Sequence, residues 1–242
     1  MDKAALLETL LPYRGQVIAV VGSGGKSSLL AWMARAFPGK VWLSTTTHLA
    51  GDQDKLAEGH TVFGADAALP APDALSQSRT WLFTGPADNE GKWTALSAVQ
   101  QEELVRQAKE NAVTLVFEAD GSRGRPLKAP APHEPALPPG CELVLLAAGL
   151  AGLGKPLSAD WVHRPGEFAR ISGINLGEEV TPIALARVLA LYPNRGQAMP
   201  SHVLVLNQLD ELRSEFALEA LLTELNAHTK WSALWAGSLR KM

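Results

Sequence analysis

Seven consecutive residues near the start of the chain have the composition of a phosphate-binding loop. They are Gly22, Ser23, Gly24, Gly25, Lys26, Ser27 and Ser28. Small residues let backbone N–H groups face an anion, a lysine supplies a positive charge, and a serine hydroxyl can bind Mg²⁺. We therefore expect all seven residues to bind a nucleotide, with Ser27 also acting as a metal ligand.

The spacing of this loop differs from the common pattern G-x-x-x-x-G-K-S/T, which would place a glycine at Val20. The first glycine is instead Gly22, so the loop is shorter, and in this it resembles the Gly-x-x-Gly-Lys-Thr-Thr loops of Mur-type ligases. A glycine turn that binds no phosphate is the structural alternative. An apolar strand before the loop and a helix start after it favour nucleotide binding, because the helix dipole would then point its positive end at the phosphates.

Two acidic residues follow an apolar run at residues 113–117. Glu118 and Asp120 are two positions apart, so they share a face if the strand continues. A carboxylate at the end of a buried strand can hold Mg²⁺ directly or through water, as in a Walker B element. We expect Asp120 to bind the metal, with Glu118 as the alternative, and we expect both acids in the catalytic site. The other interpretation is that Asp120-Gly121 is only a turn.

Three cations come next, at Arg123, Arg125 and Lys128, on a loop that prolines stiffen. Cationic groups beside a metal site suit the recognition of a phosphate or another oxyanion. We expect these three residues to act in catalysis, on the side of a second substrate or of the transition state. A solvated basic turn is the alternative. A second basic cluster, to which local spacing assigns no role, follows at His163, Arg164 and Arg170.

Hydroxyl groups follow a short strand that we expect at residues 40–43. Thr45, Thr46 or Thr47 could reach Mg²⁺ or a terminal phosphate if the strand ends at the ligand edge of a parallel sheet. Threonine is also common at strand ends for structural reasons. The general base stays open among Glu118, His48 and His133.

Another expected strand, residues 201–206, leads into an Asn-x-x-Asp pattern at Asn207 and Asp210. This pattern resembles the guanine-reading motif of GTPases, in which the Asp accepts hydrogen bonds from the base and a Lys stem lies over the ring. Gln208 replaces that Lys. We expect Asn207 and Asp210 to contact the nucleotide base, and the alternative is an ordinary strand end whose Asp caps the next helix.

The elements that position these residues alternate between strands and helices. This order predicts an α/β, P-loop NTPase-like three-layer fold with a mostly parallel central sheet, and one nucleotide-binding domain over residues 1–242. Helices are expected near residues 6–11, 29–37, 97–108, 181–191 and 218–225. The signal is weaker in the segment around residues 51–95, where we expect an irregular inserted excursion with short strands near 61–64 and 80–84.

The composition argues against several classes of protein. The chain has 242 residues, a formal net charge of −3 and a pI near 6.1, so no general basic field attracts nucleic acid. Its one cysteine, Cys141, excludes an internal disulfide and fits a reducing cytoplasm. No run of about eighteen apolar residues occurs. We expect a cytoplasmic protein that binds neither nucleic acid nor a membrane.

Taken together, these motifs resemble the YqeC family, accessory proteins for selenium-dependent molybdenum hydroxylases. The resemblance rests on the Gly-Ser-Gly-Gly-Lys-Ser loop, Thr45-Thr46-Thr47-His48, the segment 118–134, Gly154-Lys155-Pro156-Leu157 and His163-Arg164-Pro165. It departs from the family at Ser27-Ser28, where threonines are common, and at Gln208, where Lys is common.

The resemblance implies a protein that binds GTP or ATP with Mg²⁺, and hydrolyses it, during maturation of a selenium-containing molybdenum cofactor. The implied partner is a molybdenum hydroxylase or its cofactor. Two classes stay open within this interpretation: a nucleotide hydrolase and a GTP-driven switch. An ATP-dependent ligase or kinase-like enzyme that activates a small anionic substrate is the alternative, because of the Mur-type loop.

Overall fold

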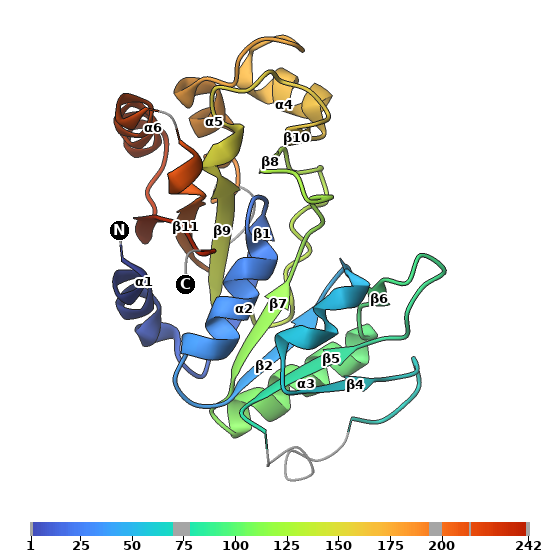
Figure 1. Cartoon of the computed structure of the whole chain (residues 1–242). Helices are drawn as coiled ribbons and strands as arrows, with labels where there is room; N and C mark the ends of the chain where they lie inside the picture. Colours follow the sequence, from blue (N-terminus) through green and yellow to red (C-terminus); the bar gives the residue numbers. More distant parts are fainter. Residues whose placement is uncertain (1, 70–77, 194–199, 213, 241–242) are drawn as a thin grey trace.

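The computed structural model describes residues 2–69, 78–193, 200–212 and 214–240, which are built around one large sheet (Figure 1). The sheet has eight strands in the order β12-β11-β9-β1-β7-β2-β5-β4, and every neighbouring pair is parallel. Parallel neighbours need crossover connections, which the helices supply. The predicted α/β fold with a parallel central sheet is confirmed, and it is consistent with a P-loop NTPase-like three-layer fold.

The helices and strands have the following bounds. The sheet strands are β1 (Val17–Gly22), β2 (Val41–Thr45), β4 (Gly59–Val62), β5 (Thr80–Thr84), β7 (Thr114–Glu118), β9 (Leu143–Gly149), β11 (Ser201–Asn207) and β12 (Ala233–Ala236). Two small ladders pair β8 (Leu127–Lys128) with β10 (Val162–His163), and β3 (His48–Leu49) with β6 (Trp93–Thr94). The helices are α1 (Lys3–Leu10), α2 (Lys26–Ala36), α3 (Ala98–Glu110), α4 (Pro165–Ser172), α5 (Pro182–Leu189) and α6 (Glu215–His228). Among the described helices, none is long and apolar enough to cross a membrane.

Side chains of the central strands alternate between two buried faces of the sheet. Ile18 and Val20 of β1 pack with α1 and α2 on one face. Ala19 and Val21 belong to a cluster with α4, α5 and α6 on the other face, and α3 covers the remaining half of that face. Strands that are buried on both sides read as continuous apolar runs, which is why the sequence revealed them clearly.

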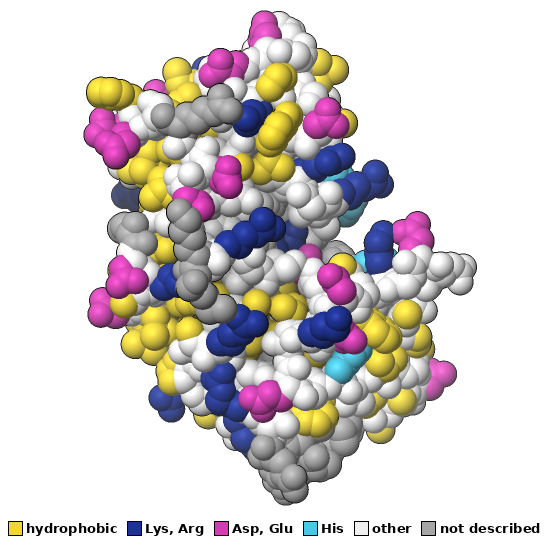
Figure 2. All heavy atoms as spheres, in the orientation of Figure 1, with side chains coloured by type: hydrophobic (Ala, Val, Ile, Leu, Met, Phe, Trp, Pro, Cys, Tyr) yellow, Lys and Arg dark blue, Asp and Glu magenta, His cyan; other side chains and the backbone are white. Residues whose placement is uncertain are grey.

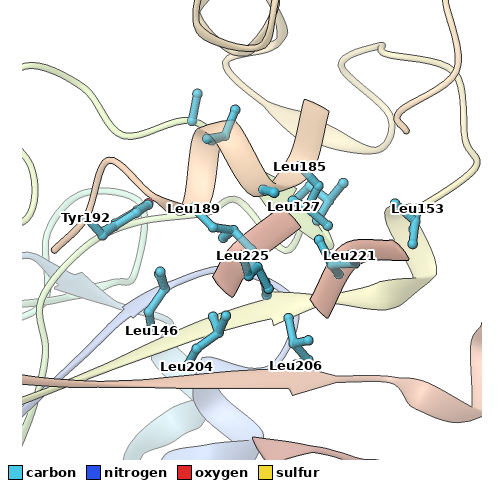
Figure 3. Close-up of a cluster of buried hydrophobic side chains, with 14 of the residues drawn as sticks. Leu127, Leu146, Leu153, Leu185, Leu189, Tyr192, Leu204, Leu206, Leu221 and Leu225 are labelled. Atoms are coloured by element: carbon cyan, nitrogen blue, oxygen red, sulfur yellow. The ribbon is translucent and has the colours of Figure 1, made fainter. Parts of the chain in front are cut away.

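The cluster under α5 and α6 also anchors the segment that carries the basic residues. Figure 3 shows side chains of β9 and β11 facing those of α5 and α6, with Leu127 of β8 among them. Leu127 is 1% exposed. The loop that precedes it, residues 121–126, is therefore tethered to the core at one end.

Two helix starts form as their local sequences predict. Ser97 and Gln100 make a reciprocal capping box at the start of α3, and the Thr181 side chain accepts from Ala184 N at the start of α5. Each cap satisfies amide donors that the first turn of a helix leaves without a partner.

The segment around residues 51–95 is less separate from the sheet than we expected. Its two short strands form as β4 and β5, and both join the parallel central sheet at the edge beyond β2. Edge position explains the weak signal in the sequence, because the side chains of β4 are half-buried or exposed and so lack a continuous apolar run. The described strands of this segment therefore extend the central sheet.

Candidate functional site

The loop between β1 and α2 lies at the carboxyl edge of the sheet, where β1 runs between β7 and β9 (Figure 1). Ligands of open parallel sheets bind beyond this edge. Ser23 N donates to Ala147 O of β9 at 2.9 Å, and Gly24 N donates to Arg125 O at 3.1 Å. The predicted phosphate loop is thus held between β9 and the segment that carries the basic residues.

Two glycines of this loop occupy positions where a side chain would collide with neighbouring atoms. Gly24 has a φ of +72°, and a Cβ there would lie 2.4 Å from the backbone of Gly149. A Cβ on Gly25 would lie 2.1 Å from Nδ2 of Asn207. Because that nitrogen donates to Gly24 O at 2.8 Å, the absence of side chains here lets β11 brace the loop.

A cleft of about 500 Å³ opens over the loop, a volume in the range of small-ligand sites. The loop and the first turn of α2 contribute Gly24, Gly25, Lys26, Ser27 and Ser28 to its lining. No side chain caps α2, so the first amides of the helix keep their donors for another partner. The space-filling view shows several Lys and Arg side chains around the middle of the face of the molecule that it draws (Figure 2). An anion would find both hydrogen-bond donors and positive charge here.

Lys26, the first residue of α2, is 4% exposed and is held by groups of the protein itself. Its Nζ donates to Gly22 O at 2.9 Å, and it lies 3.2 Å from Oδ1 of Asp120 and 3.8 Å from Oε1 of Glu118. To bind a phosphate, the ammonium group would have to exchange these partners for oxygen atoms of the ligand.

The ion pair between Lys26 and Asp120 begins a row of alternating charges that runs away from the loop. Nζ of Lys128 lies 2.7 Å from Oδ2 of Asp120 and 2.9 Å from Oε2 of Glu134. The Glu134 carboxylate accepts from both terminal nitrogens of Arg164, at 2.7 and 2.9 Å. All of these residues except Arg164 are at most 8% exposed. Buried charges persist only when they are paired, so each member of the row depends on its neighbours.

The pKa values of the two glutamates at this edge shift in opposite directions. Burial would raise the pKa of Glu134, but hydrogen bonds from Arg164 and Lys128 outweigh it and lower the pKa to about 2. Burial raises the pKa of Glu118 to about 7 against the attraction of Lys26. Oε2 of Glu118 is buried and has no hydrogen-bond partner. Glu118 is therefore suited to take up a proton or a cation near neutral pH.

The structure separates the two acids that the sequence left as alternatives. Glu118 lines the cleft. Asp120 does not: it is 0% exposed, and its Oδ2 accepts from Gly22 N at 2.8 Å. Asp120, the acid that we first expected to bind the metal, instead holds the phosphate loop in this arrangement, and Glu118 is the acid that faces the cleft.

The cleft offers oxygen atoms to Mg²⁺ but not a complete set of protein ligands. Ser27 and Glu118 line it together, and Thr47 adds a buried hydroxyl that has no hydrogen-bond partner. Within the described ranges, no group of three or more His, Cys, Asp or Glu side chains could hold a metal ion. These residues fit Mg²⁺ only if phosphate oxygens and water complete its coordination, as they usually do at nucleotide sites.

The polar residues after β2 also divide between structural and cleft-facing roles. Oγ1 of Thr45 and Oγ1 of Thr46 donate to backbone carbonyls, at 3.0 and 2.7 Å, so Thr47 is the threonine that remains for the cleft. His48 lines the cleft, whereas His133 is exposed and lies outside its lining. The histidine candidates for a general base therefore narrow to His48.

The three cations that we expected to face a substrate lie in different surroundings. Arg123 lines the cleft, and Arg125 lies outside its lining. Lys128 is 3% exposed between the carboxylates of Asp120 and Glu134. Lys128 thus neutralises two acids of the protein, and contact with a substrate would require it to exchange one of these partners.

The Asn-x-x-Asp pattern lies beside the segment that follows β12. Asn207 is 2% exposed, and its Oδ1 accepts from Leu239 N at 2.9 Å while its Nδ2 holds the phosphate loop. Asp210 is exposed, and the Ser238 hydroxyl donates to its Oδ1 at 2.5 Å. Gln208 lines the cleft and Asp210 does not. The Asn-x-x-Asp pattern and the segment that follows β12 are thus adjacent, and Gln208 brings this part of the chain to the lining of the cleft.

Among the cleft residues that had no role in our sequence analysis are Gln53, Lys92 and Arg240. Nε2 of Gln53 donates to Oγ of Ser27 at 2.6 Å, across 26 positions of the chain. Its Oε1 is buried with no hydrogen-bond partner. No local pattern announces such a contact, because it arises when the connection after β3 folds back over α2.

Comparisons with known proteins agree with this arrangement of motifs. A family model described as "YqeC protein" matches residues 18–166. The chain is 32% identical to "Uncharacterized protein YqeC" of Escherichia coli (strain K12) over 256 residues, which cover 100% of this chain and 94% of the relative. No solved structure matches the chain.

The raised pKa of Glu118 predicts a pH-dependent gain in stability for Glu118→Gln. In the unfolded chain this acid ionises near its ordinary pKa of 4.5, but in the folded protein it ionises near 7. The acid therefore lowers the free energy of unfolding as pH rises between these values, by at most about 3 kcal/mol. Denaturant unfolding at about pH 5 and about pH 8 measures this, and the advantage of Glu118→Gln over the wild type should grow with pH.

Glu102→Gln is the matched control, because Glu102 is an exposed acid on α3. Its effect should be small and nearly constant with pH. A Glu118→Gln effect that is equally flat would show that the folded protein does not raise the pKa of Glu118.

Proposed function

This chain belongs to the YqeC family, and we propose that it binds a nucleoside triphosphate, GTP or ATP, together with Mg²⁺ and hydrolyses it. The observation that carries this proposal is the position of Lys26, the first residue of α2. Lys26 is buried next to Asp120, beside a cleft that is lined by the start of α2, and no side chain caps this helix start. A lysine in this place has the position of a phosphate-binding lysine.

Each residue of the cleft has a proposed task in this reaction. The amides of residues 25–28 and the ammonium group of Lys26 bind phosphate oxygens. Ser27 and Glu118 hold Mg²⁺, which withdraws negative charge from the phosphates when it is bound. Gln53 orients the Ser27 hydroxyl through its 2.6 Å hydrogen bond. His48 accepts a proton from the attacking water, or Glu118 does so if Ser27, phosphate oxygens and water hold the metal without it.

We further propose that this nucleotide reaction serves the maturation of a selenium-containing molybdenum cofactor or hydroxylase in the cytoplasm. Family membership supports this role, through the resemblance described above. Steady-state hydrolysis with the purified chain alone would support an independent enzyme. Hydrolysis only after addition of a molybdenum hydroxylase apoenzyme would support a switch that delivers cofactor to a partner.

An ATP-dependent ligase or kinase-like enzyme is the second candidate. The shorter phosphate loop favours it, and so does Arg125, a cation close to the loop but outside the nucleotide cleft. A ligase or kinase would turn over ATP only in the presence of its anionic co-substrate, whereas a simple hydrolase would not need one.

Lys26→Ala should lower triphosphate affinity by about a hundredfold, because charge-assisted hydrogen bonds to phosphate disappear. The variant should also lose stability, since Asp120 would stay buried with fewer cations around it. Calorimetric titration with Mg²⁺ and a non-hydrolysable analogue measures affinity, and circular dichroism checks the fold. Lys40→Ala, at an exposed lysine just before β2, should change neither property.

A second variant keeps this test informative if Lys26→Ala unfolds. Ser27→Ala removes one hydroxyl without exposing a buried charge, and it should weaken binding by about tenfold with Mg²⁺ and little without it. Equal binding by the wild type and both variants would contradict a phosphate site at this loop.

Asp210→Ala should lower GTP affinity about ten- to a hundredfold and barely change ATP affinity, because only guanine donates N1 and N2 hydrogen bonds to a carboxylate. Glu211→Ala is the matched control, since it removes an exposed acid at the next position. Competition between GTP and ATP for one site gives both affinities. If ATP wins in the wild type and Asp210→Ala alters nothing, the end of β11 is a structural brace and the ATP-using alternative is favoured.

A further inference from the structure

A second cleft, of about 560 Å³, adjoins the first and shares Gly121 and Arg123 with it. It lies between the loop that follows β7 and the segment from β10 into α4. The charged or titratable side chains of its lining are those of Arg123, Arg125, His163 and Arg164, and no carboxylate side chain of the described residues lines it. Figure 2 shows Lys and Arg side chains with a His at the right-hand edge of the molecule. The cleft is therefore concave, of small-molecule size and positively charged.

Two of its arginines have no counter-charge among the described carboxylates. No described carboxylate forms an ion pair with Arg123 or Arg125, although the other charged residues around them are paired. Arg125 is half-buried, and its backbone carbonyl accepts from Gly24 N in the phosphate loop. A cation on a tethered backbone and without a described counter-charge is suited to an external anion.

The third arginine is held in position by the buried row of charges. Glu134 accepts from both terminal nitrogens of Arg164, and NH1 of Arg164 also donates to Ala129 O at 3.2 Å. These bonds use three of the five guanidinium donors and fix the plane of the group. The remaining donors belong to a side chain that is 30% exposed and lines the cleft. Little conformational entropy is left to lose when this arginine binds a ligand.

The backbone is in a left-handed conformation on both sides of the cleft. Arg123 has a φ of +51° and Arg164 a φ of +63°. Long side chains seldom adopt this conformation, which costs about 1–3 kcal/mol and tends to occur at ligand sites. Two such residues line the same cleft, which fits a ligand site there.

His163 adds a neutral group between these cations. Burial, followed by the charges of Arg164, Lys128 and Arg123, lowers its pKa to about 4, against the opposing charge of Glu134. At neutral pH the ring therefore supplies one donor and one acceptor and no charge. It can receive a proton-bearing oxygen of a ligand as well as donate to a bare one.

We propose that this second cleft binds a small molecule through a dianionic oxyanion group such as a phosphate monoester, at a site separate from the triphosphate site. Three guanidinium groups without a lining carboxylate match the charge and the several oxygen atoms of such a group. The concave shape, the small volume and the net charge of −3 of the whole chain favour a small molecule over a nucleic acid backbone. The role of this ligand as a co-substrate of the nucleotide rests on the proposed function. Its binding to the second cleft does not.

Titration of the ¹⁵N-labelled full chain with inorganic phosphate tests this site, with amide shifts to locate the bound anion. We expect shifts at the amides of residues 121–125 and 162–166, except at Pro165, which has no N–H. Arg125→Gln should lower the phosphate affinity that these shifts report by about ten- to a hundredfold, and Arg125→Lys should lower it less. The fold should survive, because the backbone bond from Gly24 N to Arg125 O does not need the side chain.

Arg170→Gln is the matched control for loss of one positive charge. Arg170 lies on α4 outside the cleft, is 68% exposed and pairs with Glu167, so its substitution should leave phosphate binding unchanged. An equal loss in Arg170→Gln and Arg125→Gln would overturn the proposal, because binding would then follow the general charge. So would shifts confined to residues 22–28, or acetate that binds as tightly as phosphate at the same ionic strength.

The result can be separated from that of the nucleotide experiments. Shifts at residues 121–125 and 162–166 in a protein that binds neither GTP nor ATP would support the second site and contradict the proposed function. Nucleotide binding without these shifts would support the proposed function and contradict the second site.

Discussion

The structure around the cleft depends on the burial of Asp120. This carboxylate has no contact with solvent and is held by Lys26, by Lys128 and by the amide of Gly22. Removal of one partner from a buried pair commonly costs about 3–5 kcal/mol, because the remaining charge keeps its desolvation penalty. The end of β7, the phosphate loop and β8 are therefore fixed relative to one another by one acid.

The same arrangement means that the two clefts are connected. A triphosphate would draw Lys26 away from Asp120, and Asp120 would then depend more strongly on Lys128, which also serves Glu134. Glu134 in turn holds Arg164 at the second cleft. The backbone bond from Gly24 N to Arg125 O adds a shorter connection. Binding at one cleft is thus expected to alter affinity at the other, with the reciprocity that linkage requires.

Local sequence predicted the parts of this site that lie within single motifs. The strand, loop and helix around Lys26 follow from apolar runs and glycine spacing, and the position of Glu118 follows from the end of a buried strand. Spacing could not show that Lys128 is buried. A lysine that faces solvent and one that pairs with a carboxylate six positions later, as Lys128 does with Glu134, leave no different pattern in the sequence. The contacts of Gln53 with Ser27 and of Arg164 with Glu134 join segments 26 and 30 positions apart, so they depend on the tertiary fold.

The most direct test of the central claim is a crystal structure of the chain with Mg²⁺ and a non-hydrolysable triphosphate analogue. The account predicts that the phosphates lie against the amides of residues 25–28, that Nζ of Lys26 has left Asp120 for a phosphate oxygen, and that Glu118 faces the metal. A bound nucleotide elsewhere on the protein, or phosphates in the cleft with Lys26 still 3.2 Å from Asp120, would contradict it.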